Sequence, residues 1–159
     1  MTTTLKQNPT TKDANPGTRN LTPVAEALAD ILNDTYRLVV KSHTYHWNVT
    51  GPLFFAIHNL TEEQYTDMFA AVDVIAERIR ALGKPASVSI ADLSKSSSGS
   101  LAAVEMVKDL LSDHESLVRR FHALVEIAES EKDPVTADLA TERSAFHEKA
   151  AWMLRSIAA

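Results

Sequence analysis

The chain has 159 residues with a net charge of −5, and 45% of its residues are hydrophobic. This length allows one domain with a substantial core and is too short for two comfortable ones. The absence of cysteine excludes a disulfide framework, a zinc–thiolate site and a thiol nucleophile, so nitrogen and oxygen atoms must hold any metal. With only four glycines and six prolines, the composition favours helices, and we expect an all-α protein.

The first 21 residues differ in character from the rest. They are rich in Thr, Asn, Lys and Pro and have almost no apolar periodicity. Residues 1–21 are therefore predicted to be a disordered tail and residues 22–159 a single domain. The charged residues of the tail are Lys6, Lys12, Arg19 and Asp13. The tail thus carries +2 and the body −7, which suggests that the tail contacts an anionic polymer.

No targeting or membrane segment is apparent in the sequence. The N-terminus lacks the apolar region of a secretory signal, and no later run approaches the roughly 18 apolar residues of a membrane span. We therefore expect a cytoplasmic protein without a membrane partner.

The first two predicted helices meet at a Gly-Pro break. Thr22 is the expected N-cap of the first helix, which should cover residues 23–49 because its apolar residues recur at helical spacing. Gly51-Pro52 should end it. The second helix should cover residues 53–82 and close at Gly83, and at 1.5 Å per residue it is roughly 45 Å long.

The third and fourth predicted helices follow a longer connection. Residues 86–93 are predicted to form a short helix, followed by a flexible Ser-rich link. The last helix should start at Pro134 with Asp133 as its N-cap. The residues expected to face the core are Val104, Val107, Leu111, His114, Val118, Phe121 and Val125 in the third helix, and Val135, Leu139, Phe146, Met153 and Ile157 in the last. Four long helices predict a bundle whose second connection crosses its length, as in ferritin-like folds.

Histidines and carboxylates gather on one face of the second predicted helix. At ~100° per residue, His58, Glu62, Asp73 and Glu77 fall within an arc of about 100°. His58 and Asp73 are about 22 Å apart along the axis, so one chain cannot close a shared metal centre. Two copies with antiparallel helices across a two-fold axis would join the opposite ends twice, and His46 would add a second imidazole. Two imidazoles and three carboxylates suit Fe²⁺ and leave positions open for water and oxidant.

The same residues have plainer interpretations. An acid pair four residues apart, such as Asp73 and Glu77, is usually solvated or paired with a cation such as Arg78 or Arg80. Spacing alone leaves both interpretations open. The histidines that we leave out of the site are His43, His114, His122 and His147, and His114 is expected to be a satisfied core residue.

The segment HWNVTGPLFFAIHNLTEEQYTDMFAAVDVIAERIRALG resembles the ferroxidase signature of the Dps family, the miniferritins called DNA-binding proteins from starved cells. The match combines His-Trp-Asn, a Gly four residues after that Trp, a His twelve residues after the first, and Asp-x-x-Ala-Glu-Arg before Leu-Gly. The resemblance implies a hollow homo-dodecamer with intersubunit centres of two irons each. These centres would oxidise Fe²⁺, preferably with hydrogen peroxide rather than O₂, and Fe³⁺ would be stored inside, which protects DNA from oxidative damage.

The resemblance also assigns the site residues. The implied iron ligands are His46, His58, Glu62, Asp73 and Glu77. The family usually has Asp at the position of Glu62, so the carboxylate is kept but reaches one methylene further. Trp47 matches a Trp that lies beside the centre in the family, and interface packing is its plainer role.

Three further acids match the pores through which iron enters at the three-fold axes of the family. They are Asp133, Asp138 and Glu142, for which an N-cap and a solvated pair are the plainer roles. Two other functions stay open. One is a nucleoid-associated architectural protein that binds DNA through Lys6, Lys12 and Arg19 of each tail, and the other is a metal-free interaction scaffold.

Overall fold

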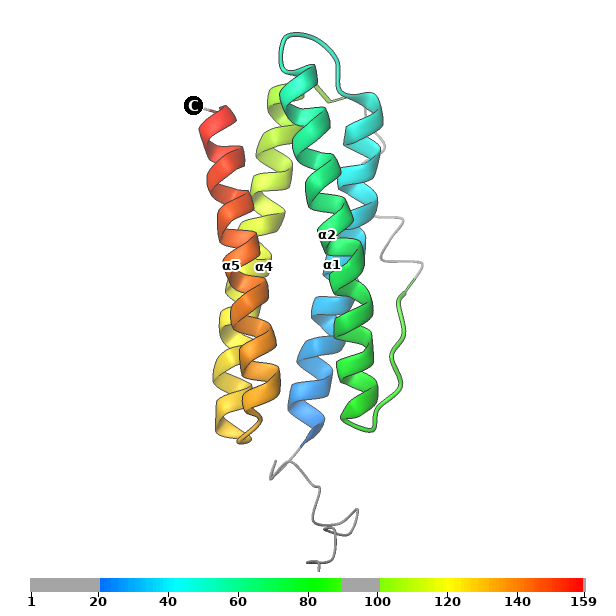
Figure 1. Ribbon diagram of the computed structural model, residues 1–159, viewed down its shortest axis with the longest axis vertical. Helices are drawn as coiled ribbons and strands as arrows, with labels where there is room; N and C mark the ends of the chain where they lie inside the picture. Colours follow the sequence, from blue (N-terminus) through cyan, green and yellow to red (C-terminus); the bar gives the residue numbers. More distant parts are fainter. Residues whose placement is uncertain (1–20, 90–100, 159) are drawn as a thin grey trace, which may run out of the picture.

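Four long helices form the regular structure of residues 21–89 and 101–158, which are the residues that the computed structural model describes (Figure 1). They are α1 (Leu21–Asn48), α2 (Phe54–Ala81), α4 (Ala103–Ser130) and α5 (Pro134–Ala158). α1 packs against α2, α4 packs against α5, and α1 also contacts α4. α2 ends and α4 begins at opposite ends of the bundle, so their connection crosses its length. The predicted all-α, ferritin-like four-helix bundle is confirmed.

Two sequence predictions fall wholly or partly outside the described residues. Residues 1–20 of the predicted tail, with Lys6, Lys12 and Arg19, lie outside them, and so does half of the short helix predicted at 86–93. Residues 86–89, which are described, are not helical. Within the described ranges, no helix combines the length and the apolar character needed to cross a bilayer.

The ends of the first two helices follow the expected backbone chemistry, with one shift. Gly51 and Gly83 have φ angles of 87° and 82°, which glycine adopts without the steric cost of a Cβ atom. The Gly83 amide donates to the carbonyl of Arg80, as expected of a glycine that closes a helix. α1, however, begins at Leu21, so Thr22 lies in its first turn rather than before it. Pro23 is still tolerated there, because amides in the first turn have no intrahelical partner.

The start of α5 is tied to the end of α2. Asp133 caps the helix, because its Oδ1 accepts the Thr136 amide at 3.1 Å and its Oδ2 accepts the Thr136 hydroxyl at 2.6 Å. Nη2 of Arg78 also donates to Oδ1 of Asp133 at 2.6 Å. Burial opposes the charged form of Asp133, but the hydrogen bonds from Arg78 and Thr136 outweigh it and hold its pKa below the usual value. The predicted N-cap is confirmed. The same carboxylate also forms a buried ion pair with Arg78, which joins the start of α5 to α2.

The buried face of α4 lies slightly to one side of the predicted seam. Val107, His114 and Phe121 are buried as expected, but Val104 is 42% exposed. The row of leucines beside the predicted seam is buried and shares the core with it. Its members are Leu110, Leu117 and Leu124.

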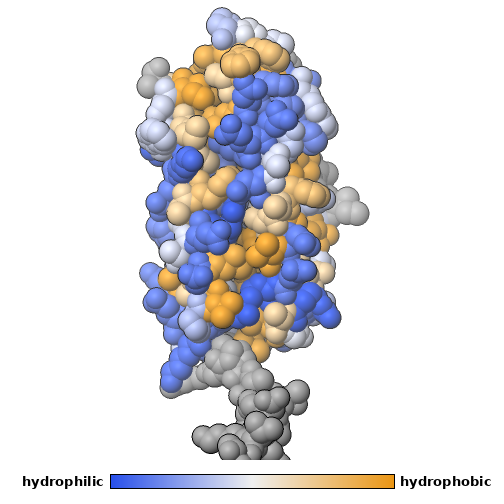
Figure 2. Space-filling model, in the orientation of Figure 1, coloured by the Kyte–Doolittle hydropathy of each residue, from blue (hydrophilic) through white to orange (hydrophobic). Residues whose placement is uncertain are grey.

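The prediction for α5 was wrong at Val135, which is 56% exposed. Phe146, Met153 and Ile157 are partly buried against the core, in line with the prediction. Apart from Leu154, however, the buried residues of this helix are small or polar, which periodicity in large apolar residues could not reveal. They are Thr136, Ala140, Arg143, Ser144, His147, Ala150, Ala151 and Leu154. Apolar side chains also reach the surface, where Figure 2 shows apolar patches between the hydrophilic ones.

Candidate metal centre

The turn between α1 and α2 places two histidines against each other. His46 lies in the last turn of α1 and His58 near the start of α2, and their ring centroids are 3.7 Å apart in a stacked arrangement. Nδ1 of His46 lies 2.8 Å from the carbonyl oxygen of His58. Nδ1 of His58 lies 2.9 Å from the carbonyl oxygen of His46. Each ring is therefore oriented by the backbone of the other helix.

This reciprocal bonding decides which ring nitrogen is free. A carbonyl oxygen only accepts hydrogen bonds, so each Nδ1 must carry the proton and donate. In a neutral imidazole, Nε2 then keeps its lone pair. Metal-binding histidines are commonly oriented in this way through their second N–H group, so both rings present Nε2 as a ligand atom.

Glu62 completes a three-residue cluster within one chain. It lies one turn after His58 on α2, and its side chain is exposed. One potential ligand atom from each of His46, His58 and Glu62 lies within 4.8 Å of the other two. Two imidazole nitrogens and a carboxylate oxygen at this separation can converge on a divalent transition metal.

The other two predicted ligands lie farther along the same helix. Asp73 and Glu77 are both exposed, and the uninterrupted α2 keeps Asp73 about 16 Å from Glu62 along the axis. The structure therefore brings three of the five predicted ligands together in one subunit and leaves these two apart.

Neither distant carboxylate is neutralised by the cations that follow it in the sequence. The Arg78 guanidinium bonds to Asp133, and Arg80 donates to the carbonyl of Lys84 at 3.2 Å. Within the described residues, the side chains of Asp73 and Glu77 have no hydrogen bond or ion pair. The salt-bridge interpretation of this acid pair is therefore wrong for the single subunit, and the carboxylates stay available.

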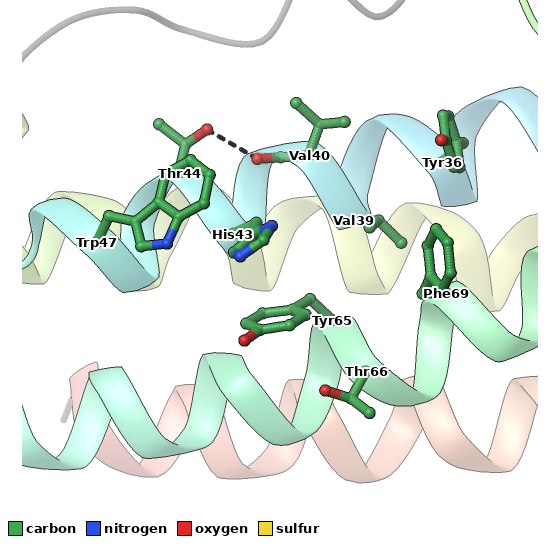
Figure 3. Close-up of a pocket in the computed structure, with 9 residues that line it drawn as sticks. All are labelled: Tyr36, Val39, Val40, His43, Thr44, Trp47, Tyr65, Thr66 and Phe69. Atoms are coloured by element: carbon green, nitrogen blue, oxygen red, sulfur yellow. Dashed lines mark hydrogen bonds between the residues drawn. The ribbon is translucent and has the colours of Figure 1, made fainter.

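An apolar groove of about 480 Å³ runs along α1 and α2 beside the cluster (Figure 3). Trp47 is 65% exposed and Phe69 59% exposed, although both are large and apolar. An exposed aromatic surface of this kind marks a binding face. The residues that line the groove are Tyr36, Val39, Val40, His43, Thr44, Trp47, Tyr65, Thr66 and Phe69.

His43 belongs to this neighbourhood, although the sequence analysis left it out. Its ring lies between those of Trp47 and Tyr65, with centroid distances of 4.1 and 4.3 Å. The Tyr65 ring meets that of His46 edge-on at 5.4 Å. The spacing of three residues between His43 and His46 places them on one helix face and was a usable signal.

The three predicted pore acids do not behave alike. Asp138 and Glu142 are exposed, lie one turn apart on α5 and have no partner among the described residues. Asp133 is fully buried, and its bonds to Arg78 and Thr136 account for it as a structural residue. Only Asp138 and Glu142 are therefore placed where a passing cation could meet them in this subunit.

The chain is similar to several known proteins. The ferritin-like domain family matches residues 25–159. DNA protection during starvation protein 2 of Bacillus anthracis is 36% identical over 139 residues, which cover 84% of this chain and 94% of the relative. The X-ray structure of Dps from Thermosynechococcus elongatus matches with a TM-score of 0.82 at 32% identity, covering 87% of this chain and 91% of that chain. A Dps structure from Vibrio cholerae O1 matches with a TM-score of 0.80 at 27% identity, covering 86% of this chain and 89% of that chain. That protein is described as a member of a broad superfamily of ferritin-like diiron-carboxylate proteins.

The long crossover and the match over residues 25–159 define a ferritin-like class of protein. Within that class, relatives and structural neighbours alike carry the names of Dps proteins. The chain belongs to the Dps family.

Proposed function

We propose that this protein oxidises Fe²⁺ at intersubunit centres of two irons and stores the Fe³⁺ in a hollow dodecamer. The cluster of His46, His58 and Glu62, with both Nε2 atoms freed by the backbone bonds, carries this proposal. The diiron-carboxylate description of the Vibrio cholerae relative supports iron as the metal. Iron is the substrate here, and hydrogen peroxide is the preferred oxidant, with O₂ as the slower one.

The proposed reaction balances without a further reductant. Each of two Fe²⁺ ions gives up one electron, and hydrogen peroxide accepts both as its O–O bond breaks. The products are two Fe³⁺ ions and two hydroxide ions, which then contribute to the hydrated oxide. This step consumes both reactants that would otherwise form hydroxyl radicals, and so it would protect nearby DNA.

A two-fold axis at the middle of α2 would complete the centre. Such an axis, between residues 67 and 68, would place Glu62 opposite Asp73 of the second copy and His58 opposite its Glu77. Phe69 lies near this midpoint, and at ~100° per residue it is on the same face of α2 as these four groups. The exposed groove at Phe69 is therefore where a second copy would pack, and its burial would drive the pairing.

Mixing two inactive variants tests this geometry directly. One carries His46→Ala and His58→Ala, and the other carries Asp73→Ala and Glu77→Ala. Each alone should lose rapid peroxide-dependent oxidation after anaerobic Fe²⁺ loading. In a mixed dimer one centre receives both mutant halves and the other receives none, so random co-assembly should restore about a quarter of the wild-type rate. If co-assembled particles stay as inactive as the parents, the centre is not shared between subunits.

A neighbouring acid supplies the matched control for the ligand assignment. Glu62→Ala should abolish rapid oxidation, whereas Glu63→Ala should not, because its side chain leaves α2 about 100° away. Both residues are exposed, so general loss of surface charge affects the two variants equally. Equal rates for the two variants would overturn the role of Glu62. By the balance above, each peroxide should oxidise two Fe²⁺ ions.

Asp138 and Glu142 are the residues that we propose for iron uptake. Three copies around a three-fold axis would focus negative potential and raise the local Fe²⁺ concentration. The variant Asp138→Asn/Glu142→Gln should slow core formation, with little change in the rate of the first oxidation when Fe²⁺ is loaded to the centres beforehand. A rate of core formation equal to that of the wild type would refute this pore.

DNA contact is a second proposed activity, and the net positive charge of residues 1–21 supports it. The acidic body would repel DNA, so Lys6, Lys12 and Arg19 of the tails would have to provide the contact. Many tails on one particle would add their weak contacts. Gel shifts at low and physiological salt, with and without residues 1–20, test this mechanism, and binding that survives the truncation contradicts it.

A further inference from the structure

A cluster of buried polar side chains lies where α2, α4 and α5 meet, apart from the proposed iron site. His114 of α4 and His147 of α5 are fully buried, and their Nδ1 atoms lie 2.9 Å apart. Gln64 of α2 is 3% exposed and Arg143 of α5 is 7% exposed. Within the described residues, these four side chains hold five buried atoms that have no protein hydrogen-bond partner. They are the two histidine Nε2 atoms, both amide atoms of Gln64 and Nε of Arg143.

The register of the helices brings these groups to one level of the bundle. Nη2 of Arg143 donates to Asp67 at 2.7 Å and so joins α5 to α2. Gln64 lies one turn before Asp67, and His147 lies one turn after Arg143. Because α2 and α5 run antiparallel (Figure 1), the bond between Arg143 and Asp67 brings Gln64 and His147 to about the same level of the bundle. Phe146 lies near both, since its ring centroid is 5.0 Å from that of His147 and its side chain lines a groove together with Gln64.

The positions of the protons show which hydrogen-bond donors and acceptors in the cluster have no protein partner. Two facing Nδ1 atoms at 2.9 Å share one proton, so one ring donates through Nδ1 and the other accepts. In a neutral pair, the donating ring keeps a lone pair on Nε2, and the accepting ring carries N–H at Nε2. Gln64 adds an acceptor and two donor hydrogens, and Arg143 adds one N–H at Nε. Donors and acceptors are thus both present, and both are buried without protein partners.

We propose that this junction is an internal binding site for water, which bridges Gln64 to the histidine pair and to Arg143. A buried polar atom without a partner is strongly unfavourable, and water is the small molecule that both donates and accepts. It needs two to four polar partners, which these side chains supply. The site ties α2 to the α4–α5 pair through solvent rather than through direct apolar packing.

The electrostatics of the junction favour a neutral ligand over a metal ion. Burial, and then the positive charge of Arg143, lowers the pKa of His114 to about 3. Burial likewise lowers the pKa of His147, with His114 and Arg143 adding to the effect. Burial thus keeps both imidazoles neutral, and the positive charge of Arg143 disfavours a bound cation. The pair further offers only two nitrogens, fewer ligands than protein sites for zinc usually provide.

A groove between α2 and α5 gives solvent a route to the site. Its volume is about 230 Å³, and Gln64, Asp67 and Phe146 are among the residues that line it. All the residues that line it belong to α2 and α5. Water can therefore reach the buried amide without unfolding of the bundle.

The sign of one stability change tests the proposal. Gln64→Leu keeps the size of the side chain and removes both polar atoms. If the site is dry, this change removes buried groups without partners and should raise the Tm of the assembled protein. If the site holds water, the change removes the hydrogen bonds between that water and the Gln64 amide, and should lower the Tm by roughly 3 to 6 °C. Met68→Leu, at a fully buried apolar position one turn away on the same helix, is the matched control for repacking.

A crystal structure of the wild-type protein at high resolution provides the second readout. Solvent density within hydrogen-bonding distance of Gln64 and a histidine Nε2, together with a lower Tm for Gln64→Leu than for Met68→Leu, supports the site. A junction without density, or an equal or higher Tm for Gln64→Leu, overturns the proposal. A peak about 2 Å from both histidines with an anomalous signal also overturns it, in favour of a metal ion.

Discussion

Replacing Asp133 by alanine should destabilise the subunit by about 2.5 to 4 kcal/mol. The change removes the N-cap of α5, which contributes about 1 kcal/mol. It also removes the carboxylate that accepts the 2.6 Å bond from Arg78, and hydrogen bonds to charged groups contribute about 1.5 to 3 kcal/mol. Arg78 is 15% exposed and Asp133 is fully buried, so solvent screens this pair only weakly.

Guanidinium unfolding followed by circular dichroism measures this loss at a fixed protein concentration, because assembly contributes to apparent stability. Asp138→Ala, at an exposed acid without a partner in the described chain, is the control and should change stability by less than about 0.5 kcal/mol. Asp133→Asn keeps an oxygen for the cap but loses the charge, and should fall between the two. If Asp133→Ala is as stable as Asp138→Ala, the assignment of Asp133 as a buried structural residue is wrong.

The pH dependence of the stability loss provides a second test of this prediction. The folded state holds the pKa of Asp133 below its ordinary value of 3.8. Its contribution is therefore complete above about pH 4 and is lost as pH falls further through the folded pKa. The stability gap between wild type and Asp133→Ala should be constant near neutrality and should shrink in strong acid. A gap that widens below pH 4 would contradict the ion pair.

Four further outcomes are expected. The lowered pKa values of His114 and His147 mean that the unfolded chain binds protons that the folded chain excludes. The free energy of unfolding should therefore decrease as the pH is lowered below about 6.5. His147→Gln should reduce that slope by up to about 1.4 kcal/mol per pH unit in denaturant titrations. Lys132 has a φ angle of 58°, so Lys132→Gly should raise the free energy of unfolding by up to about 1 kcal/mol. Phe69→Asp, at a 59% exposed position, should leave helical content unchanged but reduce the particle mass in native mass spectrometry. Glu62→Asp shortens the reach by one methylene and should change anaerobic Fe²⁺ affinity at that centre while oxidation persists.

The sequence predicted the helices well because their signals are local. Gly51-Pro52 and Gly83 mark helix ends through backbone conformation, and Asp133 marks a helix start through its side-chain oxygen. The crossover followed from helix order and the length of the connection. Such features need no knowledge of what packs against the helix.

The core face of α5 could not be predicted in the same way. Ala140 and Ala151 are buried there because small side chains let α5 approach α4, whereas Val135 points outward. His147 also faces the core, and only its contact with His114 on another helix explains why a histidine is accepted there. These choices depend on the partner surface, which periodicity within one helix does not describe.

The candidate metal centre was likewise only partly predictable from the sequence. Spacing placed His58 and Glu62 on one face of α2, and that follows from helix geometry alone. The backbone bonds that leave Nε2 of His46 and His58 free depend on how the turn folds back, and nothing in the spacing indicated them.

The ion pair at the start of α5 also bears on the proposed iron site. Arg78 directly follows Glu77, and a free guanidinium there would lower the negative potential of the acid stripe. Asp133 and Thr136 instead hold Arg78 against α5, with donor–acceptor distances of 2.6 and 2.9 Å. Asp133→Ala would release that cation close to a proposed ligand and so should weaken Fe²⁺ binding as well as the fold. We therefore expect Asp133 to support the iron site by neutralising Arg78, rather than by lining a pore.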